Sequence, residues 1–346
     1  MNKKKIFLML MMIAFSFLIG IKRVAASNVD YSIIPQPSDK QVSEENTYYD
    51  LKLNKNEKED LKIKVKNNSN KEIIIETNVD KATTNSNGVV EYKNSNKHKS
   101  TNLKHDITEF VKADKSSVVL LPYEEKEITY KITQPEENFE GIIVGGINFT
   151  QKLTDNSEVT GSMAVKNQYS YSIAIVLHGS KDTIKHDVTN NKVELRQSNG
   201  RNIIYFPILN NTAAFLNKVN VTGAIYKQNE NKAIYTEKVS NAQVAPNSIY
   251  EYPIGTSQTK LHPGKYLAKV SIESKGEKWE FTDKFEITEA QSKKLNSTGV
   301  IDKKNYTKYI LLAAIIVLII LLFLFLILYI RKKNKEIKEL QKYNHK

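Results

Sequence analysis

The sequence predicts an all-β protein with a membrane anchor: two tandem immunoglobulin-like antiparallel β-sandwiches followed by one C-terminal transmembrane α-helix. Short segments that alternate apolar and polar residues dominate residues 31–288. This two-residue period turns one face of each strand to a core and the other to solvent. Turn-forming residues separate the segments, as in sandwiches. An uncharged stretch of 22 residues follows at 309–330.

The N-terminus has the pattern of an export signal. Three lysines within the first five residues precede an apolar run over residues 6–21, and Ala25 and Ala26 place small side chains before Ser27. A signal peptidase cleaves after such small residues. We therefore expect residues 1–26 to be removed by cleavage between Ala26 and Ser27. Retention of the segment is the alternative, because two basic residues lie close to the cut.

The first sandwich is expected over residues 27–182. Residues 61–66 alternate an aliphatic side chain with a lysine, and residues 128–132 repeat the period. Between two further short segments lies Asn87-Gly88. This pair is a strong hairpin signal, because both residues tolerate a positive φ angle.

The second sandwich is expected over residues 183–290, and a polar stretch at 181–191 marks the boundary between the two sandwiches. Its last strand carries Trp279, the only tryptophan, on the same face as further aromatic and aliphatic side chains. Large aromatic residues dominate sandwich cores, so we interpret Trp279 as a core residue. A ligand-stacking role is the alternative.

A membrane anchor is expected after the second sandwich. Residues 291–308 are polar and predict a stalk. At about 1.5 Å per residue, a helix over 309–330 is about 33 Å long and crosses a hydrocarbon core of about 30 Å. The tail at 331–346 carries seven Lys and Arg residues against two Glu, so the positive-inside rule places it in the cytoplasm. We expect a single-pass protein of the cell membrane whose main body lies outside.

Charge and cysteine content exclude two classes of protein. The net charge is +13, but the signal and the tail contribute +5 each, which leaves +3 for residues 27–308. With no nucleic-acid-binding motif, this balance excludes nucleic acid as a partner. The absence of cysteine excludes a disulfide framework, so each sandwich must depend on its own apolar core. Many Lys, Asn and Ile residues together with an export signal are typical of a Gram-positive cell surface.

Longer sequence motifs indicate a family. The first half contains YSIIPQPSDKQ, YYDLKL, KVKNNSNKEI, DKATTNSNGVVEY and NFEGIIVGGINF, and the second contains VAPNSIYEYPI, LHPGKYLAKV and KWEFTDKFEITEAQSKKLN. In this order they resemble the peptidoglycan-binding domain and the host-binding domain of the WxL-interacting proteins of Gram-positive bacteria. The resemblance implies that the first half binds peptidoglycan or an anionic wall polymer. It implies a WxL-domain surface protein or a host extracellular protein as the partner of the second, and a main body that faces the cell wall and the exterior.

The sequence gives no sign of catalysis. The six histidines are scattered, and no metal, nucleotide or nucleophile motif occurs. We therefore predict a non-enzymatic binding protein without a cofactor or a metal. The alternative is a weak peptidoglycan hydrolase that uses a carboxylate pair among Glu136, Glu137 and Glu140. We favour a solvated acidic turn, because closeness in sequence does not create the geometry of a glycosidase.

One segment, residues 92–110, predicts a binding loop. It is long and has little strand character, and such connections often carry binding residues. Its basic side chains could contact carboxylates of peptidoglycan stem peptides or of anionic wall polymers. The candidate ligand-binding residues are Lys97, His98, Lys99, Lys104 and His105. The alternative is a solvated surface loop with one helical turn over residues 103–111.

Overall fold

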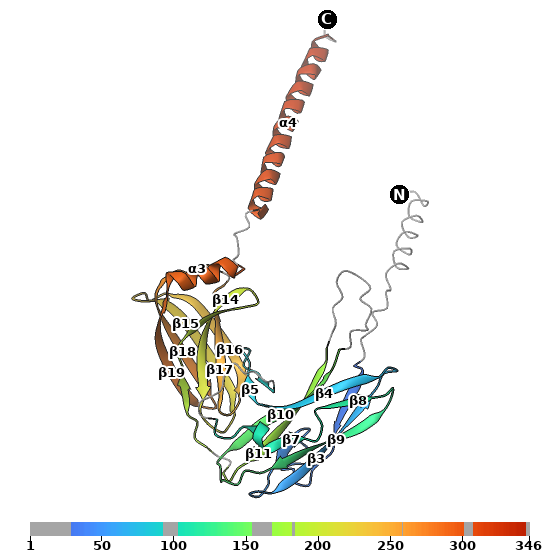
Figure 1. Cartoon of the computed structure of the whole chain (residues 1–346). Coiled ribbons are helices and arrows are strands. Elements are labelled where there is room, and N and C mark those ends of the chain that lie inside the picture. Colours follow the sequence, from blue (N-terminus) through green and yellow to red (C-terminus); the bar gives the residue numbers. More distant parts are fainter. Residues whose placement is uncertain are drawn as a thin grey trace.

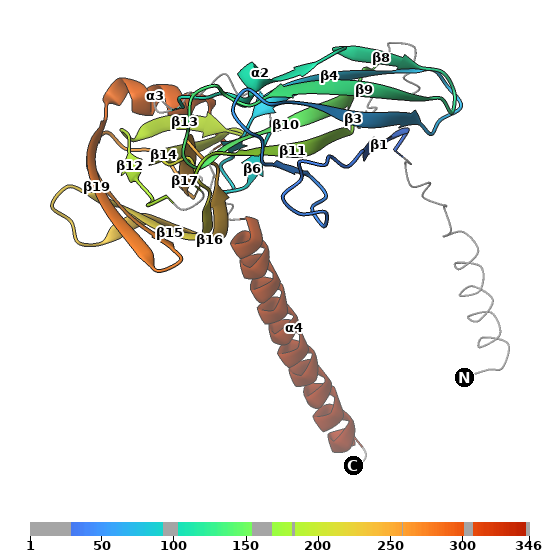
Figure 2. The same cartoon turned by 90° about the horizontal axis from the view of Figure 1, so that it is seen from below.

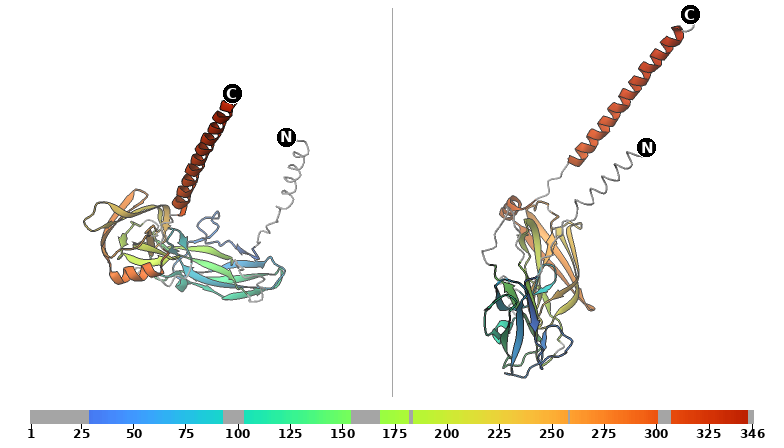
Figure 3. Two further views of the ribbon diagram at one scale, coloured as in Figure 1. Left: turned by 90° about the horizontal axis from the view of Figure 1, so that it is seen from above. Right: turned by 90° about the vertical axis from the view of Figure 1, so that its right-hand side faces the viewer.

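The computed structural model describes residues 29–92, 103–153, 168–181, 184–257, 259–300 and 307–343. Two β-sandwiches lie next to each other, and a long helix at the C-terminus extends away from both (Figure 1). The views in Figure 3 give the same arrangement from above and from the side. The predicted class, all-β with two sandwiches and one C-terminal helix, is confirmed. The predicted cleavage site at Ala26 and Ser27 lies outside the described residues.

The first sandwich consists of two sheets that face each other. One sheet has the strand order β1 (Tyr31–Pro35), β3 (Lys58–Asn67), β9 (Glu125–Thr133) and β7 (Val111–Ala113). The other has the order β2 (Tyr49–Leu51), β11 (Ser170–His178), β10 (Ile142–Gln151), β4 (Ile73–Lys81) and β8 (Ser117–Leu120). Neighbouring strands are antiparallel except β2 and β11.

The core of the first sandwich follows the alternation in the sequence. Leu61, Ile63 and Val65 on β3 are buried, and the lysines between them point outward. They face Phe149 and its neighbours on the opposite sheet. Burial of each such side chain stabilises the fold by about 1.5–3 kcal/mol. The hydroxyl of Tyr31 donates to the carbonyl of Phe149 at 2.9 Å, which joins the two sheets at one end.

The second sandwich also has two sheets. One has the order β12 (Val188–Asn190), β14 (Arg201–Asn210), β17 (Ser248–Gly255), β5 (Thr83–Thr84) and β6 (Val90–Glu91), with β13 (Glu194–Ser198) also paired to β14. The other has the order β16 (Ala233–Val244), β15 (Leu216–Lys227), β18 (Gly264–Ser274) and β19 (Glu277–Ile287). Strands β5 and β6 come from the first half of the chain and nevertheless belong to this sandwich.

Trp279 lies at the border of the second core. Its side chain is half-buried and packs against that core, and its ring meets the His186 ring edge-on with 6.5 Å between centroids. Asp283, the polar residue on the same face, accepts a hydrogen bond from the Val193 amide at 3.1 Å. Trp279 is therefore a partly buried residue at the edge of the core and not one of its central residues.

The segment expected as a stalk begins as a packed helix. Helix α3 (Glu289–Thr298) starts with a capping box between Thr288 and Gln291. Ser292 is buried and its hydroxyl donates to the Leu261 carbonyl at 2.8 Å, and Leu295 packs against the core of the second sandwich. Residues up to 298 thus belong to the second sandwich, and a spacer can begin only after them.

The C-terminal helix α4 (Thr307–Tyr343) is longer than the predicted span of 309–330. Within residues 311–334, the most apolar window of 18 residues has a mean hydropathy of 3.7, and this window is not buried by any other part of the described chain. By length and composition this helix can cross a membrane. The sequence after 330 is polar but contains no proline or glycine that would end the helix.

Candidate binding site at the domain junction

A hairpin of the first half joins the two sandwiches. Strands β5 and β6 pair around Asn87-Gly88, as the sequence predicts. Strand β5 then pairs in parallel with β17, with Thr84 opposite Tyr250. The hairpin therefore extends a sheet of the second sandwich (Figure 2). The boundary at 182/183 stays a prediction, but residues 83–91 fold with the second sandwich.

Three polar contacts hold the hairpin in place. The hydroxyl oxygen of Thr84 accepts a hydrogen bond from the Ala245 amide at 2.9 Å and lies 3.2 Å from the Ser248 hydroxyl. The carbonyl of Gly88 accepts from the Gln243 amide at 2.9 Å. These groups are buried or close to buried surface, where an unpaired polar group would be costly.

Glycine permits the close approach of the two sandwiches at one further point. Gly141 has φ +81°, and a Cβ atom there would lie 2.1 Å from the Ala213 carbonyl oxygen. The next residue, Ile142, donates its amide to the same carbonyl at 2.8 Å. A glycine at this place in NFEGIIVGGINF is thus required by packing.

The junction has an apolar cluster of its own. Ala82, Val144, Val176 and Ala245 are buried together, and half-buried side chains such as Phe215 pack around them. Residues of both sandwiches contribute to this cluster. The hairpin, the Gly141 contact and this cluster together make the junction a packed interface.

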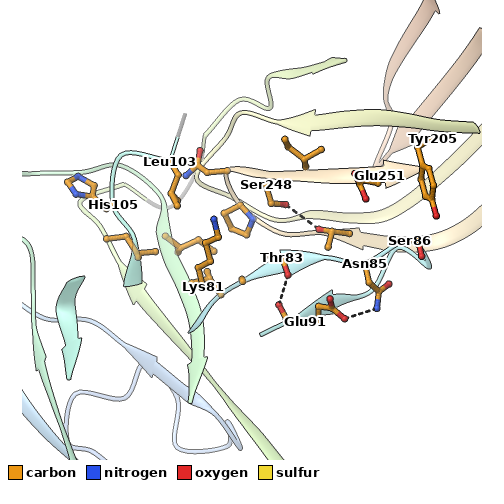
Figure 4. A pocket seen from close by; sticks show the side chains of 18 residues that line it. Lys81, Thr83, Asn85, Ser86, Glu91, Leu103, His105, Tyr205, Ser248 and Glu251 are labelled. Atoms are coloured by element: carbon orange, nitrogen blue, oxygen red, sulfur yellow. Dashed lines mark hydrogen bonds between the residues drawn. The ribbon is translucent and has the colours of Figure 1, made fainter. Parts of the chain in front are cut away.

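Two openings at the junction are lined by both sandwiches. The inner one, here called the junction cavity, has a volume of about 220 Å³ and is shown in Figure 4. The outer one, here called the outer groove, has about 730 Å³. Both are lined by His105, Ile142, Ile143 and Asn247. They therefore lie next to each other along the junction.

Two of the five predicted ligand-binding residues lie at these openings. Lys104 lines the outer groove, and His105 lines both openings. The His105 ring also packs against Phe110 and Phe139, with centroids 5.8 and 5.7 Å away. Lys97, His98 and Lys99 lie outside the described residues. The predicted helical turn is present as α2 (Ile107–Phe110), which Asp106 caps by accepting from the Thr108 amide at 3.0 Å.

The junction cavity is polar and carries both signs of charge. Lys81 reaches it from the end of β4, and within the described chain no ion pair of this lysine is present. Glu91 accepts from the Asn85 amide group at 3.2 Å. Glu251 binds Arg196, whose guanidinium lies 4.3 Å from the centre of the Tyr205 ring. Apolar side chains such as Ile142 and Ile143 complete the lining, so the cavity offers both polar and apolar contacts to a small ligand.

Sequence reasoning did not find these cavity residues. Lys81 and Glu91 come from the first half of the chain, and Tyr205 and Glu251 from the second. No local pattern links them, because the β5–β17 pairing that brings them together has no signal in sequence spacing.

The acidic residues of the hydrolase alternative are exposed. Glu137 and Glu140 line the outer groove, and Glu136 lies outside both openings. Glu140 forms an ion pair with Lys181 at 3.7 Å, and both side chains are largely in solvent. Within the described chain no cluster of three potential metal ligands occurs. This arrangement fits a solvated acidic turn.

Comparison with models of known protein families shows the family to which the chain belongs. Residues 31–151 match the model of the WxL Interacting Protein peptidoglycan binding domain. Residues 160–297 match the model of the WxL Interacting Protein host binding domain. The chain belongs to the WxL-interacting protein family. The order of the two domains in this WxL-interacting protein is the predicted order, and the resemblance found in the sequence motifs is confirmed.

Solved structures with a similar fold are distant. The Salmonella enterica SafA pilin in complex with the SafB chaperone is 10% identical, covers 75% of this chain and 99% of its own, and has a TM-score of 0.31. The Acinetobacter baumannii CsuC-CsuE chaperone-tip adhesion subunit complex is 11% identical, covers 72% and 97%, and has a TM-score of 0.29. At these values the likeness carries no inference about function. The comparison with curated proteins gives no match.

Proposed function

We propose that this WxL-interacting protein is a membrane-anchored, non-enzymatic scaffold of a Gram-positive cell surface. Its first sandwich binds peptidoglycan, and its second holds a WxL-domain surface protein or a host extracellular protein. The observation that carries the proposal is the match of residues 31–151 and 160–297 to a peptidoglycan binding domain and a host binding domain, in that order.

The anchor supports the same proposal. Helix α4 has a window long and apolar enough to cross a bilayer, and the sequence beyond it is strongly basic. With the tail in the cytoplasm, both sandwiches lie between the membrane and the wall. A binding protein held there can connect the membrane, the wall and a surface protein.

The junction supports a role as a scaffold. The β5–β6 hairpin, the contact between Gly141 and Ala213, and the buried apolar cluster each join the two sandwiches. Domain interfaces that are packed and apolar resist relative motion better than flexible linkers do. The two binding domains are therefore held at a defined distance, as a scaffold requires.

The test uses the full chain in detergent micelles. It is mixed separately with purified peptidoglycan and with a purified WxL-domain protein from the same cells. We expect saturable binding to both, measured by sedimentation with peptidoglycan and by titration calorimetry with the protein. Failure to bind peptidoglycan would contradict the role of the first sandwich. Release of soluble muropeptides would favour the hydrolase alternative.

A further inference from the structure

The two sandwiches contain the same buried asparagine at the same place. Asn67 ends β3 and Asn210 ends β14, and both are fully buried. Each donates its amide to the carbonyl four residues later, Lys71 at 2.7 Å and Ala214 at 2.8 Å. Each also accepts from the amide two residues later, at 2.9 and 3.1 Å respectively. The two turns are structural equivalents.

Both asparagines hold a second, proline-containing turn. Asn67 donates to the Leu121 carbonyl and Asn210 to the Ala245 carbonyl, each at 2.9 Å. In each case the next residues are a proline and a residue with positive φ: Tyr123 at +60° and Asn247 at +46°. The amide of Tyr123 donates to the Ser69 carbonyl, and that of Asn247 donates to the Thr212 carbonyl. Tyr123 and Asn247 therefore occupy equivalent positions.

Tyrosine is an unfavourable residue at this position. A positive φ strains residues with a bulky side chain, and Asn and Gly tolerate it best. Nine non-glycine residues of the described chain have a positive φ; five of them are Asn, and Tyr123 is the one aromatic residue among them. Such strain costs about 1–3 kcal/mol. The equivalent turn with Asn247 forms without this cost.

Burial does not offset the strain at Tyr123. The side chain is 65% exposed, and the neighbouring Leu121 and Val119 are 54% and 45% exposed. The turn lies at the end of β8, which is the end of the first sandwich far from the second (Figure 1). Asn247, in contrast, lines both openings at the junction. The fold therefore gives no reason for an aromatic ring at position 123.

The end of the first sandwich that carries Tyr123 does not favour the addition of a strand from another protein. In the second sandwich, hairpin strand β5 pairs at Tyr250, three residues after Asn247. Three residues after Tyr123 stands Lys126, whose amine donates to the Val119 carbonyl at 2.7 Å and pairs with Glu124 at 3.1 Å. A lysine across a strand edge opposes the addition of another strand.

The exposed groups fit a sugar ring. The face of an aromatic ring is electron-rich and attracts polarised C–H groups, such as those on one side of a pyranose. Asn68 and Asn70 are exposed on either side of Ser69, whose carbonyl binds the Tyr123 amide. Their amides can donate to and accept from sugar hydroxyl and acetamido groups. The turn is also rigid, because the Leu121 amide is held by the Glu124 carboxylate at 2.8 Å.

We propose that Tyr123 stacks on a pyranose ring of the peptidoglycan glycan strands. This inference rests on the proposed function that the first sandwich binds peptidoglycan. The tyrosine ring gives the contact face, and the turn around Asn67 fixes its direction before the ligand arrives. Such preorganisation lowers the entropy cost of binding.

The test replaces Tyr123 by the residue that the chain itself uses at the equivalent turn. Full-length Tyr123→Asn in detergent should bind peptidoglycan about three- to tenfold more weakly, the range of one aromatic stacking contact. Its unfolding midpoint should stay equal or rise, because strain is relieved. Tyr123→Phe should keep the affinity. Lys275→Asn is the matched control. It changes a residue with a φ of +47° in the second sandwich and should leave the affinity for peptidoglycan unchanged.

A second binding measurement uses glycan strands from which an amidase has removed the stem peptides. It shows whether Tyr123 contacts the sugars or the peptides. The proposal expects the same loss of affinity on this substrate. If wild-type protein binds peptidoglycan and Tyr123→Asn binds equally well, the proposal is overturned while the proposed function stands. If wild-type protein does not bind peptidoglycan, the proposal about Tyr123 and the proposed function both fail. A lower unfolding midpoint for Tyr123→Asn would also overturn the proposal about Tyr123. So would a variant that loses binding to lipid vesicles or to a secreted protein and keeps its binding to glycan.

Discussion

Thr84 and Tyr250 lie opposite each other in a parallel strand pair, although one belongs to the first half of the chain and the other to the second. Through this pair the first sandwich supplies the hairpin that extends a sheet of the second. The two domains of this WxL-interacting protein are consequently joined by backbone pairing as well as by side-chain packing.

Gly88→Ala should destabilise the junction. A Cβ atom there would lie 2.5 Å from the Ala242 side chain, at a φ of +72°. We expect a loss of about 2–4 kcal/mol in the free energy of unfolding, since overpacking and a side chain at positive φ both contribute. Gly276→Ala is the matched control, because its φ is +90° but its surroundings are open. It should cost about 1 kcal/mol. Equal losses in urea unfolding would contradict a packed hairpin.

Local features of the fold were predictable, and the junction was not. The alternation at residues 61–66 and the Asn87-Gly88 pair predicted strands and a hairpin, because these signals act between near neighbours. The β5–β17 contact rests on a single residue pair between distant segments, which no periodicity encodes. Helix α3 was missed in favour of a stalk. Its capping residues Thr288 and Gln291 are visible in the sequence, but the polar composition suggested a spacer.

The candidate site was predictable only in part. Lys104 and His105 line the junction openings, and their role in binding stays a prediction. Lys81 and Glu251 line the junction cavity too, but only the fold brings them there. The strain at Tyr123 also depends on a φ angle that composition does not give. The repeated turn sequences, Asn67-Asn68-Ser69 and Asn210-Asn211-Thr212, were in principle visible as an internal repeat.

Replacing either buried asparagine should be costly. Asn67→Ala and Asn210→Ala each remove the donor to buried or partly buried carbonyls. We expect each change to lower the unfolding free energy by about 2–3 kcal/mol. Asn68→Ala, next to the first site but exposed, should change it by less than about 0.5 kcal/mol. Thermal unfolding followed by circular dichroism measures all three. A neutral Asn67→Ala would show that the turn does not depend on this amide.

The protein should lose stability at alkaline pH through its buried tyrosines. Burial raises the pKa of Tyr31 and of Tyr49 to about 12, and burial likewise raises the pKa of Tyr250. Because the folded-state pKa is higher than that of the unfolded chain, their stabilisation is complete below about pH 10 and is lost as pH rises toward 12. The part of the tyrosinate absorbance that comes from these three buried residues should therefore appear together with the loss of β circular dichroism. Ionisation of these residues well before unfolding would contradict their burial.

Trp279→Ala should cost less than a change in the centre of the second core. Phe206 is fully buried, and Phe206→Ala should lower the unfolding free energy by about 3–5 kcal/mol. Trp279 is half-buried, so its loss should cost roughly 1.5–2.5 kcal/mol, since part of its surface is already in water. Chemical unfolding of both variants, followed by circular dichroism, compares them directly. A loss near zero for Trp279→Ala would favour the ligand-stacking alternative.

The orientation of the anchor can be tested with single cysteines, because the chain has none of its own. Ser297→Cys lies at the exposed end of α3, before the span, and Asn344→Cys lies in the basic tail. In intact wall-stripped cells, a membrane-impermeant maleimide should label Ser297→Cys at once, because both sandwiches are expected outside. It should label Asn344→Cys only after the membrane is permeabilised, because seven positive charges after the span retain the tail inside. Labelling in the reverse order would place the sandwiches in the cytoplasm, where neither the wall nor a secreted partner could reach them.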